Sequence, residues 1–177
     1  NAVNNSANAF FVIVLAPVLG MVWVWLSARQ AEPNSTLKFA LAFGLIGLAF
    51  LIFYANRYFA NAQGLASLEI FVLAYLIVSV GELCLSPIGL SLMTKLSPLR
   101  MQGLIMGMWF LASAYGQYVA GLLGAGMSLS DDTKNSAHDK LMAYTDGYLQ
   151  LGLYALAAAV LLAILNRPVK QMMRGIH

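Results

Sequence analysis

Glu82 is the one charged residue in a long neutral stretch of this sequence. Every other residue from Ile70 to Thr94 is uncharged, and the stretch is long enough to cross a lipid bilayer as a helix. A charge at the centre of such a helix costs about 2.5–3.5 kcal/mol on insertion scales, so it faces a bundle interior or a hydrated cavity. A carboxyl group can hold a proton or pair with an ammonium group, and the two compete. That competition is the chemistry expected of a secondary transporter.

Helical spacing places small and polar residues on the same face as Glu82. They lie three, four or seven residues away and are Tyr75, Ser79, Ser86 and Gly89. Pro87 lacks an amide donor and crowds the carbonyl of Leu83, so a helix kink is predicted there. We expect the two serines to line a cavity with Glu82, and Pro87 and Gly89 to form a gating hinge. In the alternative reading, Glu82 only hydrogen-bonds a neighbouring helix.

Two further stretches carry polar side chains at helical spacing. Near the start of the chain these are Asn1, Asn4, Asn5 and Asn8. Later in the chain they are Gln102, Trp109, Ser113 and either Gly116 or Gln117. The candidates for lining the same cavity as Glu82 are Asn5, Asn8, Trp109, Ser113 and Gln117. Two plainer explanations stay open, because the asparagines can be a helix end in water and the second stripe can be ordinary helix packing.

The composition indicates which solvent surrounds these stretches. Of 177 residues, 60% are hydrophobic and 10% charged, whereas soluble domains carry about 25% charged residues. Five intervals between the charges are long enough to span a bilayer, at about 4–27, 38–57, 70–94, 101–127 and 147–166. Alternation typical of strands is absent, and lipid admits only helices or closed barrels. An all-α membrane protein with one helical bundle is predicted.

The basic residues are divided unequally between the two sides of this bundle. One side has Arg29, Lys38, Lys95, Arg100, Arg167, Lys170 and Arg174, and the other has Arg57, Lys134 and Lys140. The positive-inside rule therefore places the first side, with the C-terminus, in the cytoplasm. The longest connection, 131–146, is acidic and is expected as a polar outer loop. Because the short inner connections account for the net charge of +3, no nucleic-acid partner is expected.

Motifs of other protein classes are missing from the sequence. It contains neither a GxxxxGK[ST] phosphate-binding run nor an HExxH metal motif. His138 and His177 fall outside the predicted spans, and Cys84 is the single cysteine. We therefore expect no metal, no cofactor and no enzymatic activity.

The start of the chain is unusual for a membrane protein. Five spans with a cytoplasmic C-terminus place Asn1 outside, yet the sequence has no initiator Met and no signal peptide. The chain is expected to be the C-terminal part of a longer protein whose N-terminal half is absent.

Several stretches closely resemble the proton-dependent oligopeptide transporters of the major facilitator superfamily. GELCLSPIGLS (81–91), TKLSP (94–98) and GLIMGMWFLA (103–112) resemble the tenth and eleventh helices of that family. Ser6–Phe11 and Leu15–Pro17 resemble its eighth helix, and Leu37–Leu41 resembles the start of its ninth. The resemblance covers nearly the whole chain, as helices eight to twelve of a twelve-helix fold.

The resemblance implies proton-coupled symport of di- and tripeptides by alternating access, with protons as the coupling ion. It also implies a multi-pass protein of the plasma membrane, in bacteria the inner membrane. In this family the glutamate found here as Glu82 meets the amino terminus of the peptide, helped by the asparagine found here as Asn8. Trp109 and Ser113 line the same cavity, and helices ten and eleven form the hairpin that closes the cytoplasmic gate.

The sequence departs from this family pattern at two positions. Ala9 stands where the family often has proline, and Gln117 where it often has asparagine. The residues that hold the peptide carboxylate belong to the missing half, which is the expected partner of this chain. Two alternatives stay open: another major facilitator carrier, for nitrate, drugs or an amine, and a non-transporting membrane scaffold subunit.

Overall fold

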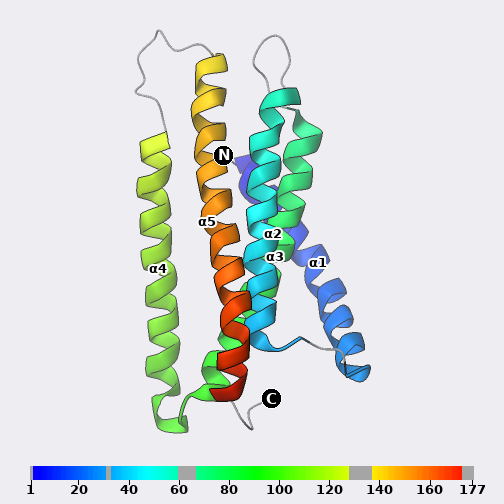
Figure 1. The fold of residues 1–177 in the computed structure, drawn as a ribbon, viewed down its shortest axis with the longest axis vertical. Coiled ribbons are helices and arrows are strands. Elements are labelled where there is room, and N and C mark those ends of the chain that lie inside the picture. Colours follow the sequence, from blue (N-terminus) through cyan, green and yellow to red (C-terminus); the bar gives the residue numbers. More distant parts are fainter. Residues whose placement is uncertain (1, 31–32, 60–66, 128–136, 173–177) are drawn as a thin grey trace.

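Five long helices make up most of the part of the chain that the structure describes (Figure 1). The computed structural model describes the backbone of residues 2–30, 33–59, 67–127 and 137–172, and the side chains of 10–30, 33–59, 67–125 and 141–169. The helices are α1 (Ala2–Ala28), α2 (Ser35–Ala55), α3 (Leu68–Leu96), α4 (Gln102–Met127) and α5 (Ala137–Met172). Two short 3-10 turns, η1 (Asn56–Phe59) and η2 (Leu99–Met101), follow α2 and precede α4. No strand occurs within the described ranges.

Four of these helices contain segments long and apolar enough to cross a membrane. The segments are Phe10–Ala28, Ser35–Phe59, Leu68–Leu96 and Leu141–Val169. A fifth span was expected over 101–127, and the 26 residues of α4 are sufficient in length. α4 is not among these four segments, and Gln102, Ser113 and Gln117 interrupt its apolar sequence. Polar side chains on a membrane helix need protein or water beside them rather than lipid.

The packing core of the bundle is α2, which lies between α3 and α5. A Cβ atom on Gly47 would lie 2.7 Å from Cγ of Leu156 and 3.1 Å from the carbonyl oxygen of Gly152. On the other side of α2, a Cβ on Gly81 would lie 3.1 Å from the carbonyl oxygen of Ala42. Glycines at these positions let helix backbones approach closely, which is how membrane helices gain packing energy.

α5 begins earlier than predicted. The interval 131–146 was expected as a polar loop with the span starting near 147, but α5 already begins at Ala137. Contacts with α2 and η1 accompany this earlier start: the Tyr148 ring stacks on Phe50 with centroids 6.1 Å apart, and Arg57 Nη1 lies 2.8 Å from Asp146 Oδ1. A ring cluster continues this contact and consists of Phe50, Phe53, Phe71, Tyr75 and Tyr148. Tertiary contacts of this kind override the local preference of an acidic segment for a loop.

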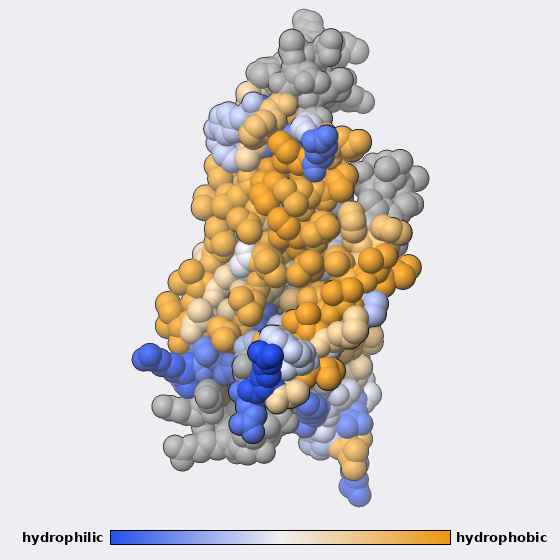
Figure 2. Space-filling view, turned by 90° about the vertical axis from the view of Figure 1, so that its right-hand side faces the viewer, coloured by the Kyte–Doolittle hydropathy of each residue, from blue (hydrophilic) through white to orange (hydrophobic). Residues whose placement is uncertain are grey.

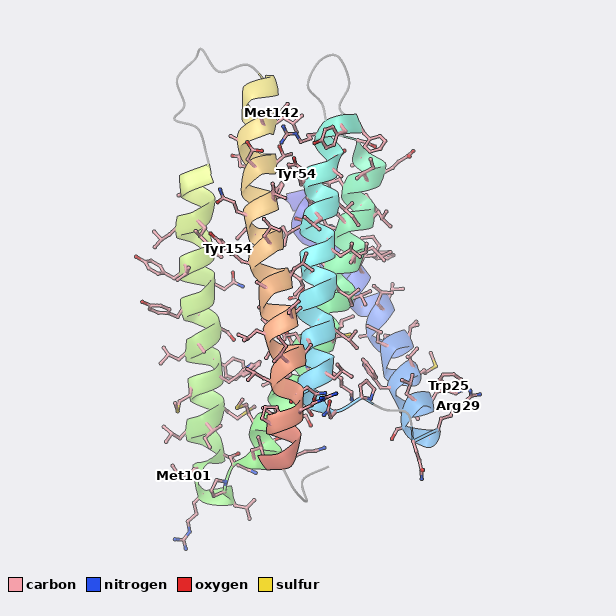
Figure 3. All side chains as sticks on the ribbon, in the orientation of Figure 1. Trp25, Arg29, Tyr54, Met101, Met142 and Tyr154 are labelled. Atoms are coloured by element: carbon pink, nitrogen blue, oxygen red, sulfur yellow. The ribbon has the colours of Figure 1, made fainter. Side chains whose placement is uncertain are left out.

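The ends of the helices at the α3–α4 turn, here called the turn end, carry most of the described basic residues (Figure 2). Side-chain contacts join three helices there. Asn34 donates from Nδ2 to Oδ1 of Asn166 at 2.7 Å, and Lys38 Nζ lies 4.6 Å from the centroid of the Trp23 ring. Arg29 lies over Trp25 at the end of α1 (Figure 3). Figure 2 shows a continuous hydrophobic surface above this end, as expected of a bundle in lipid.

α4 stands apart from the other helices (Figure 1). It follows α3 through the turn at Ser97–Met101, where Gln102 donates from Nε2 to the Thr94 carbonyl at 3.3 Å. Beyond this turn its contacts with α3 and α5 are few, and every residue from 110 to 125 is exposed. The polar side of α4 is therefore not covered by any helix that the structure describes.

Candidate functional site

Glu82 lies near the middle of α3, beside the closest contact of that helix with α2. Its neighbour Gly81 is buried, and a Cβ there would lie 2.9 Å from Cγ1 of Ile46. Successive residues turn by about 100° around a helix. Because Gly81 faces α2, the next residue, Glu82, points away from that contact. Glu82 is exposed in this structure.

The predicted polar stripe of α3 is divided between two environments. Ser79 is fully buried, and its hydroxyl donates to the Tyr75 carbonyl of its own helix at 3.0 Å. Ser86, one turn beyond Glu82, is exposed together with Pro87. α3 continues as a helix through Pro87, and the predicted kink there stays a prediction. The exposed part of the stripe therefore presents a carboxyl group and a hydroxyl group about one turn apart.

Trp109 of α4 and Gly89 of α3 are in direct contact. A Cβ on Gly89 would lie 2.7 Å from Cζ2 and 3.0 Å from Cζ3 of the Trp109 indole, and closer still to Cη2. Gly89 is buried and Trp109 is partly buried. Ser113 is exposed, and its hydroxyl donates to the Trp109 carbonyl at 3.0 Å. The structure thus brings together two of the predicted site residues, from different helices.

The remaining predicted site residues are less constrained by the structure. Gln117 is exposed on α4, two turns beyond the Trp109 contact. Asn5 and Asn8 belong to α1, but their side chains lie outside the described residues. Within the described part of the chain, no group of three His, Cys, Asp or Glu side chains could hold a metal ion.

The arrangement offers three chemically different groups along one side of α3. Glu82 supplies hydrogen-bond acceptors, Ser86 a donor and acceptor, and the Trp109 indole an apolar surface. At about 1.5 Å per residue, the Gly89 contact lies about 10 Å from Glu82 along the helix, toward the turn end. An organic cation about 10 Å long could pair with the carboxylate at one end and rest against the indole at the other.

The contact between Gly89 and Trp109 was not predicted from the sequence, although a signal for it was present. Gly89 stands eight residues before Ser97, and Trp109 stands eight residues after Met101. Two antiparallel helices joined by a short turn bring residues at equal distances from that turn side by side. Equal spacing in a helical hairpin could therefore have paired the two residues.

Comparison with known protein families identifies the family of this chain. Residues 1–141 match the POT family. The chain belongs to the POT family. Its fold class, an all-α membrane protein with the helical bundle of a major facilitator transporter, is confirmed by solved structures of this family.

Curated POT relatives are named as peptide permeases. The chain is 37% identical to dipeptide and tripeptide permease B of Aeromonas hydrophila subsp. hydrophila, over 96% of this chain and 34% of the relative. It is 36% identical to dipeptide and tripeptide permease B of Salmonella typhimurium, over 90% of this chain and 32% of the relative. The chain spans about a third of the length of these relatives.

Solved POT structures superpose on the whole bundle. A crystal structure of a peptide transporter POT in complex with sulfate matches with a TM-score of 0.77 and 32% identity, over 96% of this chain and 32% of that chain. A POT family transporter in complex with a thioalcohol-conjugated peptide matches with a TM-score of 0.76 and 26% identity, over 93% of this chain and 31% of that chain. The arrangement of α1 to α5 is thus a known part of a larger helical fold.

Proposed function

We propose that this chain is the C-terminal part of a proton-coupled symporter of di- and tripeptides. Relatives that are named dipeptide and tripeptide permeases support the substrate class. The observation that carries the proposal is the exposed Glu82, held in mid-helix on the side of α3 that turns away from α2. A carboxyl group so placed is costly in lipid and useful beside a hydrated path.

Glu82 acts in this proposal as the group that alternates between a proton and a peptide. The amino terminus of a peptide is an ammonium group, which an ionised carboxylate attracts and a protonated one does not. Asn8 is proposed to assist at the amino terminus. Asn5, Ser86, Ser113 and Gln117 are proposed to line the cavity with the indole of Trp109. Ser79, also expected to line it, is fully buried in this structure and donates to the Tyr75 carbonyl of its own helix. Protons are the coupling ion, and no other cofactor takes part.

The other half of the transport path is proposed to come from the N-terminal half of the same transporter. The exposed side of α4, with Ser113 and Gln117, is too polar to face lipid. Alternating access by rocking of two halves around a central site requires a second wall opposite α3 and α4. In the proposal, Pro87 lets the α3–α4 hairpin move as the cytoplasmic gate.

The orientation of the chain follows from its charges. The turn end carries Arg29, Lys38, Lys95, Arg100 and Arg167, whereas Arg57 is the one basic residue described at the opposite end. The positive-inside rule places the turn end and the C-terminus in the cytoplasm. We propose a multi-pass protein of the bacterial inner membrane.

The proposal is tested by uptake of a dipeptide in the complete transporter that contains this chain. Glu82→Gln removes the titratable group and keeps the shape, so uphill uptake driven by a proton gradient should be lost. Glu69→Gln is the matched control, because Glu69 is exposed in the first turn of the same helix, far from the proposed site. Glu69→Gln should retain uptake. Near-normal uphill uptake by Glu82→Gln would refute the role of this carboxyl group.

Two competitors of the proposal predict different outcomes of the same assay. A carrier for nitrate, drugs or an amine would transport its own substrate without competition by dipeptides. A scaffold subunit would transport nothing, with or without a proton gradient. Uptake that depends on the gradient and is inhibited by excess unlabelled dipeptide supports the peptide symporter.

A further inference from the structure

Gly89 is a helical glycine whose missing side chain makes room for an aromatic ring. The benzo edge of the Trp109 indole fills the place of its Cβ, with Cζ2 at 2.7 Å and Cζ3 at 3.0 Å from that position. Such distances lie well inside ordinary van der Waals contact. Any side chain at position 89 must therefore move the indole or the helix that carries it.

The contact is also one of few that hold α4 beside α3. At the turn, Gln102 donates to the Thr94 carbonyl, and two turns further along α4 the Trp109 ring reaches α3. From residue 110 onward, every described residue of α4 is exposed. The rotamer of Trp109 and the spacing of the two helices thus depend together on what stands at position 89.

The contact lies on the same side of α3 as the proposed peptide-binding carboxyl group. Gly89 follows Glu82 by seven residues, which is about two helical turns, and Ser86 lies between them. The indole therefore limits the site about 10 Å from Glu82, on the side of the α3–α4 turn.

We propose that Gly89 is a positioning residue for Trp109: the absence of a side chain seats the indole across α3 as the turn-side wall of the substrate site. This inference rests on the proposed function. It differs from the hinge role expected of Gly89, two residues after Pro87. A hinge requires backbone freedom, whereas positioning of the indole requires only that no side chain occupies its place. If Gly89 positions the Trp109 ring, substitution of Gly89 matters only while that ring is present. If Gly89 is a hinge, its substitution matters with or without the ring.

The first test reads the position of the indole without any transport. The complete transporter is labelled with 5-fluorotryptophan, and the fluorine resonance of Trp109 is assigned as the one lost in Trp109→Phe. Gly89→Ala should shift this resonance. Gly44→Ala is the control, because a Cβ on Gly44 meets nothing closer than Cβ of Ala159 at 4.0 Å, and it should leave the resonance in place. An unshifted Trp109 resonance in Gly89→Ala would refute the proposal that Gly89 positions the indole.

The second test is a double-mutant cycle on dipeptide uptake. Phenylalanine lacks the outer benzo atoms that contact Gly89. Gly89→Ala alone should raise KM on the order of tenfold, as expected for residues in contact. In the Trp109→Phe background, the same substitution should change KM by less than about twofold. An equal fold-change in both backgrounds would show that Gly89 acts as a hinge and would refute the positioning role.

The tests remain decisive when a variant fails to fold. If Gly89→Ala is lost from the membrane while Gly89→Ala/Trp109→Phe is retained, removal of the ring has rescued the fold, which supports the positioning role. If Gly89→Ala and the double variant are both lost from the membrane while Trp109→Phe alone is retained, a clash with the ring does not cause the loss. The proposed positioning role of Gly89 is then refuted. If the wild type takes up no dipeptide, the proposed function fails, and the fluorine resonance still decides whether Gly89 seats Trp109.

Discussion

Gly47 of α2 and Gly152 of α5 face each other at a point where neither helix has room for a side chain. A Cβ on Gly47 would lie 3.1 Å from the Gly152 carbonyl oxygen, and a Cβ on Gly152 would lie 3.3 Å from the Gly47 carbonyl oxygen. Both contacts are with backbone, which cannot move aside as a side chain can. This pair fixes α5 on α2, and α2 in turn carries α3 with Glu82.

Substitution at this contact should lower stability. Gly47→Ala should cost about 1–3 kcal/mol, because the methyl group forces two packed helices apart. Gly44→Ala lies one turn away on α2 and has room for a methyl group, since its nearest neighbour is Cβ of Ala159 at 4.0 Å. Thermal unfolding of the purified complete transporter should show a lower midpoint for Gly47→Ala only. Equal midpoints would contradict the close-packing argument.

An ion pair at the end opposite the turn should contribute little by itself. Arg57 Nη1 lies 2.8 Å from Asp146 Oδ1, with side chains 21% and 63% exposed. Pairs with such exposure contribute about 0–1 kcal/mol, so Asp146→Ala should have a small effect. Arg57→Ala should cost more, because the guanidinium also lies 5.0 Å from the Tyr54 ring centroid and 5.6 Å from that of Tyr58. Thermal unfolding of both variants checks the order, and a larger loss for Asp146→Ala would be inconsistent with it.

Removal of the indole should weaken substrate binding. Trp109→Ala deletes an aromatic surface beside the proposed peptide site, so the Kd for a dipeptide should rise on the order of tenfold. Trp25→Ala is the control, because Trp25 is exposed at the end of α1 beneath Arg29. The Kd of the Trp25→Ala variant for the dipeptide should equal that of the wild type. A binding titration on the purified transporter measures both, and an unchanged Kd in Trp109→Ala would argue against a wall of the site.

Pro87 should affect movement more than binding. If its missing amide weakens α3 where the hairpin gate moves, Pro87→Ala stiffens the helix and should slow turnover more than it raises Kd. Pro168→Ala in α5 is the control, since Pro168 lies inside the last turns of a helix that carries none of the proposed site residues. The maximal uptake rate and the Kd for the dipeptide, measured for both variants, show whether turnover or binding is affected more. Equal effects of Pro87→Ala on both quantities would favour a purely structural role.

The sequence was sufficient to predict the helices and to single out Glu82 for a simple physical reason. Lipid imposes the same requirement on every segment that crosses it, namely apolar side chains and internally satisfied backbone groups. The central parts of α1, α2, α3 and α5 therefore follow from hydropathy alone. A charge in such a segment is conspicuous by composition, which is why Glu82 could be recognised without a structure.

Helix ends and helix surfaces depended on neighbours and were predicted less well. α5 already starts at Ala137, and Tyr148 packs on Phe50 of α2, a contact that no local pattern within 131–146 reveals. α4 was expected as a fifth span with a polar stripe, and in the structure no described helix covers this stripe beyond Trp109. Both features depend on partners distant in the sequence.

Within the site, residue types and spacing were readable in the sequence, but their environments were not. Ser79 and Ser86 share one predicted stripe, yet Ser79 is buried and Ser86 is exposed. Gly89 and Trp109 were each singled out for separate roles, and only the packing of α4 on α3 showed that the indole occupies the place of a missing side chain. Sequence alone determined which helices form and which of them carries a charge, since those depend on each residue and its solvent. Tertiary structure decided which faces meet, since that depends on the shapes of two surfaces together.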